Sequence, residues 1–342
     1  MGEKIILSHF DSHGVATGVS LAKSYGEDKV RVIAKYPDTG PRMFAKFVND
    51  NLDMFKGKDV IIVDIPVDIS NPDEFLSALE KLSSVANKVY YLDHHETDIR
   101  YADKISKYAE MKLFRDATSM AEYVMRNCPY PVWRKLALVG VVADRDPSIL
   151  RIVKDKSTLN RLYVLANKLD VLVRRNIQDT IDNLMEKGAN YLEEVDVEYP
   201  AERIALTKLR DKVISLTSNA ILFDVLDTYS DRELGIWLPK AVEYLLYKTS
   251  RDYAVVPAIR YDPRTRGKTY TISVIQYWLS NKPEAEQLVK QIASGRKYFG
   301  HGKYVNIIVE PMNHEDMLAV ARRIFNSVAE QGRSKAPAPA LN

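Results

Sequence analysis

Residues 89–95 read VYYLDHH, a short apolar run that ends in one aspartate and two histidines. Three other apolar runs, KIILS, VIIV and LALVGVVA, are also followed by side chains that can bind a metal ion. In chain order, the side chains after the four runs are His9, Asp11, His13, Asp64, Asp93, His94, His95 and Asp144. We interpret the runs as strands of a mostly parallel sheet, whose carboxyl ends line one edge where ligands bind. The sequence therefore predicts that these aspartates and histidines converge in space.

The first half of the chain alternates such runs with amphipathic stretches, which is the pattern of a parallel sheet flanked by helices. Strands are expected at residues 4–8, 30–34, 59–63, 88–92 and 136–143. Helices are expected at residues 14–24, 41–51, 73–84 and 119–128. The last of these helices is predicted to begin at Thr118 or Ser119, with Glu122 at the spacing of a capping box. Residues 156–194 are predicted to be helical throughout.

After Tyr199 and Pro200 the rhythm changes to that of a second, smaller α/β domain. Its strands are expected at residues 220–226, 253–261, 268–276 and 304–310, and its helices at residues 238–248, 283–293 and 314–328. This organisation predicts a first domain over residues 1–165, a helical connector over 166–212, a second domain over 213–330 and a disordered tail over 331–342. The site is expected in the cleft between the two domains.

The composition indicates a globular chain with room for about two domains. Of the 342 residues, 46% are hydrophobic and 28% charged, which excludes collagen-like, low-complexity and disordered classes. No apolar run reaches the ~18–20 residues of a membrane span, and the first ten residues lack the apolar core of a signal peptide. We therefore expect a cytoplasmic protein. The single Cys128 excludes zinc fingers, iron–sulfur clusters and an internal disulfide.

The net charge of +3 is distributed unevenly along the chain. Residues 251–342 carry 14 Lys and Arg against 8 Asp and Glu, a net charge of +6, which leaves −3 for residues 1–250. The basic part is therefore the second domain. This favours an anionic partner there, although a small surface domain that happens to be basic would give the same balance.

The chain has only six histidines, which are His9, His13, His94, His95, His301 and His314. The first four of these follow expected strands. A cluster of aspartates and imidazoles without a thiolate favours hard or borderline divalent metals, Mn²⁺ or Mg²⁺ first and Co²⁺ or Zn²⁺ next. The natural chemistry of two such ions is hydrolysis of a phosphate ester. No Gly-x-Ser-x-Gly elbow, P-loop or Gly-x-Gly-x-x-Gly is present, which argues against serine hydrolases, kinases, NTPases and Rossmann dehydrogenases.

Over nearly its whole length the chain resembles the DHH phosphoesterases, named for the triplet that stands here as Asp93, His94 and His95. Segments similar to the four family motifs are SHFDSHGVATG at residues 8–18, VIIVDIPV at 60–67, YYLDHHET at 90–97 and LVGVVADRD at 138–146. DATSMAEYV at residues 116–124 resembles the Thr-Ser-x-Ala-Glu stretch of family members. SGRKYFGHGKYVN at residues 294–306 resembles the glycine-rich histidine loop of the DHH-associated domain.

The resemblance implies a site with two divalent ions and a set of catalytic residues. The implied metal ligands are His9, Asp11, His13, Asp64, His94 and Asp144, with Asp64 bridging the ions. His95 is implied to face the scissile phosphate and Asp93 to orient an imidazole, although a helix N-cap is an alternative role for Asp93. We interpret Asp146 as a turn residue before Pro147, and Arg145 as an exposed loop residue rather than a phosphate ligand.

Two departures from the family pattern bear on activity. His13 stands where the family usually has a second aspartate, which would alter the metal preference or weaken the second metal site. Tyr298 and Phe299 stand where the loop would be glycine, and Phe299 would either stack on a base or fill the core. The implied substrate-binding residues are His95, Arg296, Lys297, Gly300, His301, Gly302 and Lys303.

The resemblance implies a phosphodiesterase that cleaves short oligonucleotides or the ends of single-stranded RNA or DNA, as exonucleases of the RecJ type and nanoRNases do. A hydroxide bridging two metal ions, Mn²⁺ first, would attack the phosphorus. One alternative is a phosphatase or a cyclic-dinucleotide phosphodiesterase. Another is a weak or inactive relative that serves as a scaffold for nucleic acid or replication proteins. No membrane partner is expected, and a homodimer is left open.

Overall fold

The computed structural model of the chain describes residues 3–26, 30–34, 42–67, 71–114, 117–146, 148–226, 231–262, 267–277, 280, 282–293, 295–301 and 303–331. The chain divides into two compact units, Met1–Glu198 and Tyr199–Asn342, which are described separately. Within the described ranges no helix is both long and apolar enough to cross a membrane. The expected disordered tail lies outside these ranges, except for Gln331.

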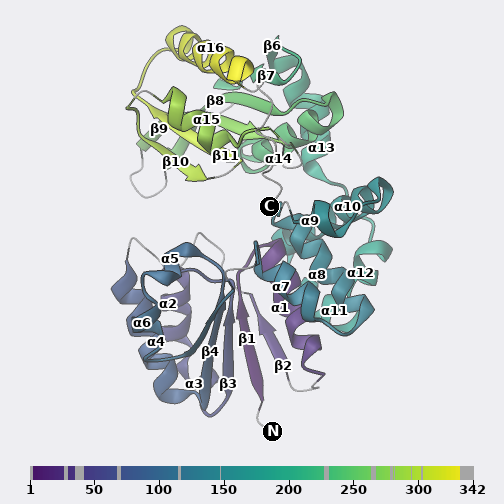
Figure 1. Ribbon diagram of the computed structural model, residues 1–342, viewed down its shortest axis with the longest axis vertical. Coiled ribbons are helices and arrows are strands. Elements are labelled where there is room, and N and C mark those ends of the chain that lie inside the picture. Colours follow the sequence, from purple (N-terminus) through teal and green to yellow (C-terminus); the bar gives the residue numbers. More distant parts are fainter. Residues whose placement is uncertain are drawn as a thin grey trace, which may run out of the picture. The chain divides into compact units, whose positions relative to one another are not determined.

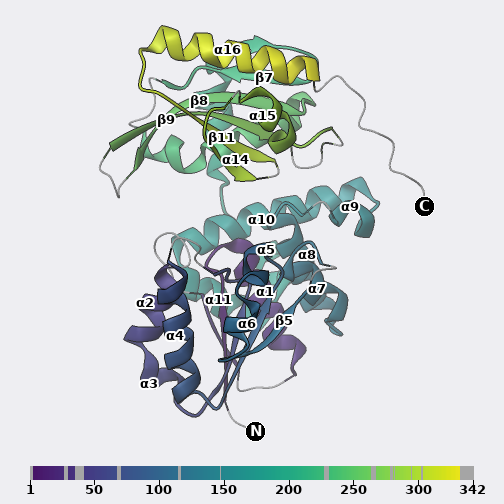
Figure 2. The same cartoon turned by 60° about the vertical axis from the view of Figure 1, so that its left-hand side comes forward.

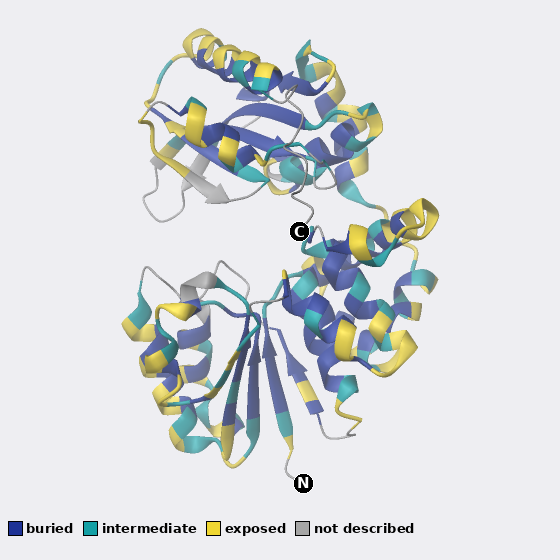
Figure 3. Ribbon diagram, in the orientation of Figure 1, coloured by how far each residue is buried: buried dark blue, intermediate teal, exposed yellow. Residues whose placement is uncertain are grey.

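Unit 1 is built on a five-stranded parallel sheet in the order β2-β1-β3-β4-β5 (Figure 1). Its strands are β1 (Lys4–Ser8), β2 (Val30–Ile33), β3 (Asp59–Val63), β4 (Lys88–Asp93) and β5 (Glu110–Leu113). Strands β1 and β3 are buried at every residue after the first, because helices cover both faces of the sheet (Figure 3). The predicted parallel sheet is confirmed. The edge strand β5, whose residues alternate between exposed and half-buried, was not predicted.

Helices flank the sheet on both sides (Figure 2). One layer consists of α1 (Ser12–Ser24), α7 (Met120–Asn127), α8 (Pro131–Ala143), α10 (Lys156–Arg175), α11 (Ile177–Lys187) and α12 (Ala189–Glu194). The other layer consists of α2 (Arg42–Asp50), α3 (Leu52–Phe55), α4 (Pro72–Val85) and α6 (Ala102–Ile105). Two further short helices are α5 (Glu96–Ile99) and α9 (Ile149–Ile152). A core that includes Ile5, Val60, Ile62 and Tyr91 joins the sheet to the second layer.

The prediction of a strand at residues 136–143 is wrong, because these residues form the second half of helix α8. The helix begins with Pro131 at its first turn and is thirteen residues long. Helices α1, α7 and α10 pack around it, so nearly every residue from Leu136 onward is apolar and the helical period is hidden. Gly140 permits the close packing, since a Cβ there would lie 3.1 Å from the Cβ atoms of both Ala16 and Ala121.

Unit 2 contains a six-stranded mixed sheet in the order β10-β11-β9-β8-β7-β6, in which only β7 and β8 are parallel. The strands are β6 (Val213–Leu216), β7 (Ala220–Phe223), β8 (Tyr253–Asp262), β9 (Gly267–Gln276), β10 (Tyr298–His301) and β11 (Tyr304–Val309). The helical elements are α13 (Pro200–Ile204), the π-helical turn η1 (Ala205–Leu209), the 3-10 turn η2 (Arg210–Lys212), α14 (Arg232–Thr249), α15 (Ala285–Ile292) and α16 (His314–Gln331). The predicted second α/β domain is confirmed. The strands β6 and β10 were not predicted.

Candidate metal centre

The strand order places the candidate site at a defined position in unit 1. Strands β1 and β3 lie side by side, and the chain leaves β1 toward β2 but continues from β3 toward β4. In sheets of this type, ligands bind at such a reversal, which here lies at the carboxyl ends of β1 and β3. His9, Asp11 and His13 follow β1, Asp64 follows β3, and the histidine pair follows β4.

The turn from β1 into α1 is unusually tight. Asp11 caps the helix, since its Oδ1 accepts a hydrogen bond of 3.0 Å from the backbone N–H of Gly14. A Cβ on Gly14 would lie 2.3 Å from the carbonyl oxygen of His9, so only glycine fits there. The closeness of the turn gathers three ligand atoms: His9, Asp11 and His13 form a group whose ligand atoms lie within 4.8 Å of one another.

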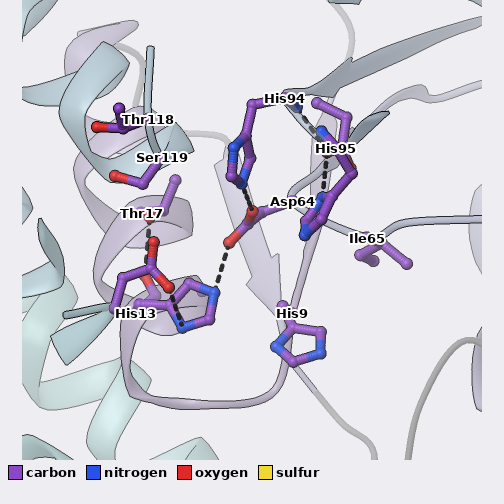
Figure 4. A network of polar contacts seen from close by, with 12 residues as sticks. His9, His13, Thr17, Asp64, Ile65, His94, His95, Thr118 and Ser119 are labelled. Atoms are coloured by element: carbon purple, nitrogen blue, oxygen red, sulfur yellow. Dashed lines mark hydrogen bonds and ion pairs between the residues drawn. The ribbon is translucent and has the colours of Figure 1, made fainter. Parts of the chain in front are cut away.

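Asp64 lies at the centre of the polar residues (Figure 4). Its Oδ2 lies 2.9 Å from Nε2 of His13, and its Oδ1 lies 3.4 Å from Nε2 of His94. The Nδ1 of His13 in turn lies 2.9 Å from Asp11 and 3.8 Å from Asp144. His9 completes the row, with Nδ1 2.8 Å from Asp11. All six predicted ligands are therefore brought together.

Asp144 reaches this group by a route other than the one predicted. It does not follow a strand but is the C-terminal cap of helix α8, where its backbone N–H bonds to the carbonyl of Gly140. The contact between α8 and α1 brings Asp144 to His13. The other ligand candidates follow the three strands β1, β3 and β4, and the fourth strand expected from the sequence is helix α8 instead.

The donor set fits a divalent cation. Both oxygens of Asp64 are buried, and among the described residues each faces an imidazole nitrogen, Nε2 of His13 or Nε2 of His94. A buried carboxylate is costly unless a positive charge compensates it, and imidazoles can do this when protonated or can share a bound cation with the carboxylate when neutral. Because the available ligands are carboxylate oxygen and imidazole nitrogen, the set suits Mn²⁺, Mg²⁺, Co²⁺ or Zn²⁺.

The charges in the site depend strongly on one another. Burial opposes ionisation of Asp11 and Asp64, but the positive charge of His13 outweighs it and holds the pKa of both carboxyls well below the usual range. Burial also opposes charging of His13, yet Asp11, Asp144 and Asp64 together raise its pKa well above the usual value. Burial raises the pKa of Asp144 to about 6. Without a bound ion, a protonated His13 thus supplies positive charge to the carboxylates around it.

Asp93 organises the histidine pair. Its Oδ1 accepts hydrogen bonds from the backbone N–H groups of His94 (2.6 Å) and His95 (2.9 Å), and it lies 2.5 Å from Nδ1 of His95. Of the two roles considered for Asp93, the geometry agrees with orientation of an imidazole; Asp93 is not a helix N-cap, because helix α5 begins only at Glu96. With Nδ1 held by Asp93, the ring atom of His95 that remains for a substrate is Nε2.

The ion pair of His95 predicts a pH dependence for the metal-free protein. Burial would lower the pKa of His95, but Asp93, with smaller effects of Asp64 and Asp98, raises it to about 9. Such an imidazole stabilises the fold fully below its unfolded pKa of about 6.5, and this stabilisation is lost as the pH rises to about 9. In EDTA, the urea midpoint of unfolding should therefore fall between pH 7 and pH 9. The fall should be smaller in His95→Gln, and an equal fall in both proteins would contradict the assignment.

A buried carboxylate network supports the turn that carries Asp144. Glu122 accepts hydrogen bonds of 2.9 Å from both the backbone N–H and the hydroxyl of Thr118, and it pairs with Arg126. The single hydrogen of that hydroxyl is shared with Asp146, whose Oδ1 lies 2.5 Å from the Thr118 oxygen and also accepts a hydrogen bond from the N–H of Ser148. The prediction that Asp146 is a turn residue is confirmed.

The network also settles two smaller predictions. Ser119 is the N-cap of α7 and accepts a hydrogen bond of 3.1 Å from the N–H of Glu122, as the capping-box spacing predicts. Arg145 is half-buried rather than exposed, because its guanidinium bonds to the carbonyl of Val142 and lies over the ring of Tyr163. Its φ of +60° marks a tight left-handed turn after Asp144.

The predicted substrate loop forms a hairpin in unit 2. Arg296 and Lys297 are exposed just before β10, Gly300 and His301 lie in β10, and Lys303 follows it. Within the hairpin, the backbone of β10 pairs with that of β11 in antiparallel register. The Nζ atom of Lys303 donates to the carbonyl of Ser280 at 3.4 Å.

Some predictions for this hairpin concern residues or side chains outside the part of the chain that the structure describes. Gly302 lies outside it, and so do the side chains of Phe299 and His301. The two roles considered for Phe299 and the phosphate-binding role of His301 therefore stay predictions. The cleft between the two units also stays a prediction.

Comparisons with known proteins agree with this fold. No protein-family profile matches the chain, and no curated protein does. Among solved structures, one similar chain is a DHH-domain protein described as a member of a family of ribosomal proteins, with a TM-score of 0.53 and 14% identity over 98% of this chain and 88% of that one. This chain has the fold of the DHH phosphoesterases.

Two further similar structures have lower TM-scores. The exonuclease RecJ bound to manganese has a TM-score of 0.45 and 16% identity, covering 99% of this chain and 93% of that one. The pGpG-specific phosphodiesterase PggH from Vibrio cholerae has a TM-score of 0.38 and 11% identity, covering 97% of this chain and 99% of that one. Within the DHH fold of this chain, the triplet Asp93-His94-His95 stands at the end of β4, beside Asp64.

Proposed function

We propose that this protein is a divalent-metal-dependent phosphodiesterase that cleaves short oligonucleotides or the ends of single-stranded nucleic acid. The observation that carries the proposal is the buried Asp64, whose two oxygens face imidazoles from two different segments. These imidazoles lie next to further carboxylates, since His13 also contacts Asp11 and Asp144. Carboxylates and imidazoles gathered in this way form a donor set that would hold divalent cations.

The ions would be held by the six ligand candidates His9, Asp11, His13, Asp64, His94 and Asp144. When bound, divalent cations lower the pKa of water and offset the negative charge of a phosphodiester. We propose Mn²⁺ as the first metal, with Mg²⁺ or Co²⁺ as alternatives. The mixture of carboxylate and imidazole ligands without a thiolate supports this order.

Besides the metal ligands, the chain contributes a positively charged side chain, His95, and a carboxylate that orients it, Asp93. Asp93 raises the pKa of His95 to about 9 despite partial burial of the ring, so His95 is positively charged near neutral pH. Because Asp93 occupies Nδ1, His95 donates through Nε2 and neutralises charge that develops on the phosphate. Asp93 keeps the ring in one orientation, as in other carboxylate–imidazole pairs.

The substrate class follows from the charge of unit 2. The part of the chain from residue 251 onward is basic, and its two exposed cations before β10 would bind the phosphodiester backbone. Two adjacent cations can contact only a few phosphates, which favours a short nucleotide substrate or the end of a strand. The proposed activity is hydrolysis of one terminal phosphodiester bond.

Hydrolysis of end-labelled RNA and DNA oligomers tests the proposal. The oligomers range upward from dinucleotides, and each is incubated with Mn²⁺, Mg²⁺, Co²⁺ or EDTA and resolved by length over time. We expect metal-dependent release of mononucleotides, with none in EDTA. Preference for the shortest oligomers would indicate a nanoRNase-like activity, and stepwise trimming of the longer ones a RecJ-like activity.

The same experiment separates the proposal from its alternatives. A protein that binds the oligomers but cuts none of them with any metal would be a scaffold, and the histidine at position 13 would be the first suspect. When 3′-phosphoadenosine compounds and cyclic dinucleotides are added to the substrates, cleavage restricted to one of them would instead assign a phosphatase or a cyclic-dinucleotide phosphodiesterase. Either outcome contradicts the oligonucleotide proposal.

Arg296→Ala tests the role of the hairpin in substrate binding. Arg296 is exposed and precedes β10, so its loss should not disturb the core. We expect KM for oligonucleotides to rise about tenfold, the effect of losing roughly 1.4 kcal/mol of binding, with KM for a small chromogenic phosphodiester unchanged. Arg322→Ala, an exposed arginine on α16 of the same unit, is the matched control. An equal effect on both substrates would contradict the proposed contact.

A further inference from the structure

The backbone at Asp64 is held in an unfavourable conformation. Asp64 has a φ of +62°, in the left-handed region that residues other than glycine rarely adopt. This conformation costs about 1–2 kcal/mol, so the surrounding structure must hold it. One restraint is the hydrogen bond from the N–H of Asp64 to the carbonyl of Leu92 in β4, at 3.1 Å. That bond fixes the residue from one side only.

Two buried side chains fix the segment that follows Asp64. The hydroxyl of Tyr91, in β4, donates to the carbonyl of Ile65 at 2.6 Å. The Oδ1 atom of Asp98, in α5, accepts from the N–H of Val67 at 2.8 Å. Tyr91 and Asp98 are both fully buried, and the Asp98 Oδ2 atom lies 3.2 Å from the Tyr91 hydroxyl. The two side chains thus hold successive peptide groups after Asp64 through one connected network.

Asp98 also fixes the turn that carries the histidine pair. Its backbone N–H donates to the carbonyl of His95 at 3.2 Å. A single residue therefore connects the segment after Asp64 with the segment that contains His94 and His95. These two segments supply the central carboxylate of the candidate metal centre and the imidazole that faces it.

We propose that Asp98 and Tyr91 are positioning residues that hold Asp64 and His94 in the geometry that binds the metal. The proposal rests on the function proposed above and goes beyond it, because neither residue touches the reacting atoms. Partners of this kind, which orient ligands from outside the coordination sphere, typically change metal affinity by about 10–100-fold when they are removed.

The hydrogen count of the network predicts which substitution is tolerated. The Tyr91 hydroxyl has one hydrogen, and the Ile65 carbonyl can only accept, so that hydrogen is directed to Ile65. The contact between Tyr91 and the Oδ2 atom of Asp98 then needs a hydrogen on the residue at position 98. Asp98→Asn places an N–H at that point and keeps an oxygen for Val67. Asparagine should therefore replace Asp98, whereas alanine should not.

The test measures Mn²⁺ affinity of the full chain by electron paramagnetic resonance of free Mn²⁺, without any substrate. We expect Asp98→Asn to bind like the wild type, and Tyr91→Phe and Asp98→Ala to bind about tenfold more weakly or worse. Phe75→Leu is the control for a general lesion of the core, because Phe75 packs edge-on against the ring of Tyr91 but makes none of these hydrogen bonds. It should lower the melting temperature and leave the affinity unchanged.

The outcomes distinguish this inference from the proposed function. A wild-type chain that binds no Mn²⁺ would overturn the metal centre and the positioning role together. A wild type that binds Mn²⁺, with Tyr91→Phe equal to it, would overturn the positioning role alone. A loss of affinity in Phe75→Leu as large as that in Tyr91→Phe would also overturn it, because the effect would then be one of general stability. If Asp98→Ala does not fold, the comparison of Asp98→Asn with Tyr91→Phe decides.

Discussion

Asp64→Asn is expected to lower Mn²⁺-dependent hydrolysis of oligonucleotides by about 10³-fold or more. Bound cations stabilise the transition state of such reactions by several kcal/mol, and each ~1.4 kcal/mol of activation free energy changes the rate tenfold. Asparagine keeps the size of the side chain but replaces one buried oxygen, which faces His13 or His94, by a hydrogen-bond donor. The loss should be found in kcat/KM for both short and long substrates.

Asp59→Asn is a matched control, because Asp59 lies at the opposite end of the same strand, β3. Its carboxylate accepts a hydrogen bond of 2.7 Å from the side chain of Asn87, far from the ligand candidates along the strand. This variant should retain the rate of the wild type. Unchanged hydrolysis in Asp64→Asn, or in His94→Ala, would contradict the proposed centre.

Gly14→Ala is expected to disrupt the first ligand segment and the stability of unit 1 together. The added Cβ would lie 2.3 Å from the carbonyl oxygen and 2.6 Å from the Cβ of His9, so the backbone of the turn must move by more than side-chain adjustment allows. Overpacking of this kind costs about 1–3 kcal/mol. Because a displacement of about 1 Å in a catalytic group can cost about 10²-fold, hydrolysis should fall by that factor.

Gly235→Ala is the control for Gly14→Ala, because the same substitution is expected to be harmless at this position. Gly235 lies in helix α14 of unit 2, and a Cβ there would meet no atom within 4 Å. Alanine in a helix interior is more stable than glycine by roughly 0.5–1 kcal/mol, so this variant should melt slightly higher and keep its activity. Thermal unfolding and hydrolysis rates of both variants check the prediction. Equal behaviour of the two would contradict the role of Gly14.

Much of the first unit could be predicted from the sequence because its strands are buried on both faces. The runs KIILS and DVIIV match β1 and β3 residue for residue, and polar ligands directly follow both. Their convergence followed from a general property of parallel sheets. The same reasoning misassigned residues 136–143, because a helix enclosed by other helices is also continuously apolar. The proline at position 131 and the length of the run from it were the signals that favoured a helix.

The parts of the site that could not be predicted depend on contacts between distant segments. Asp98 carries no motif, and its importance arises only because it reaches Val67 across the sheet edge. Glu122 was predicted as a capping-box residue, but its side chain bonds to Thr118 rather than to the N-cap. Strand β10 was predicted as part of a loop, since short glycine-containing segments give no clear strand signal, whereas its partner β11 was expected as a strand at residues 304–310.

His13 lies between two carboxylates of the candidate metal centre, which explains how a histidine fits at this position. Aspartate is usual at this position in the family that the chain resembles, and a third carboxylate there would repel Asp11 and Asp64. The imidazole instead lies between them, 2.9 Å from each. It offers positive charge when protonated and a metal ligand when neutral. Metal binding and protonation of His13 therefore compete for the same position.

The central claim is that one set of residues after β1, β3, β4 and α8 forms a single divalent-metal centre. Anomalous scattering from crystals soaked in Mn²⁺ tests it most directly. The account predicts strong anomalous density in bonding contact with the carboxylate of Asp64, with further ligands from His9, Asp11, His13, His94 and Asp144. Density found only elsewhere on the chain, at Mn²⁺ concentrations that support hydrolysis, would contradict the account.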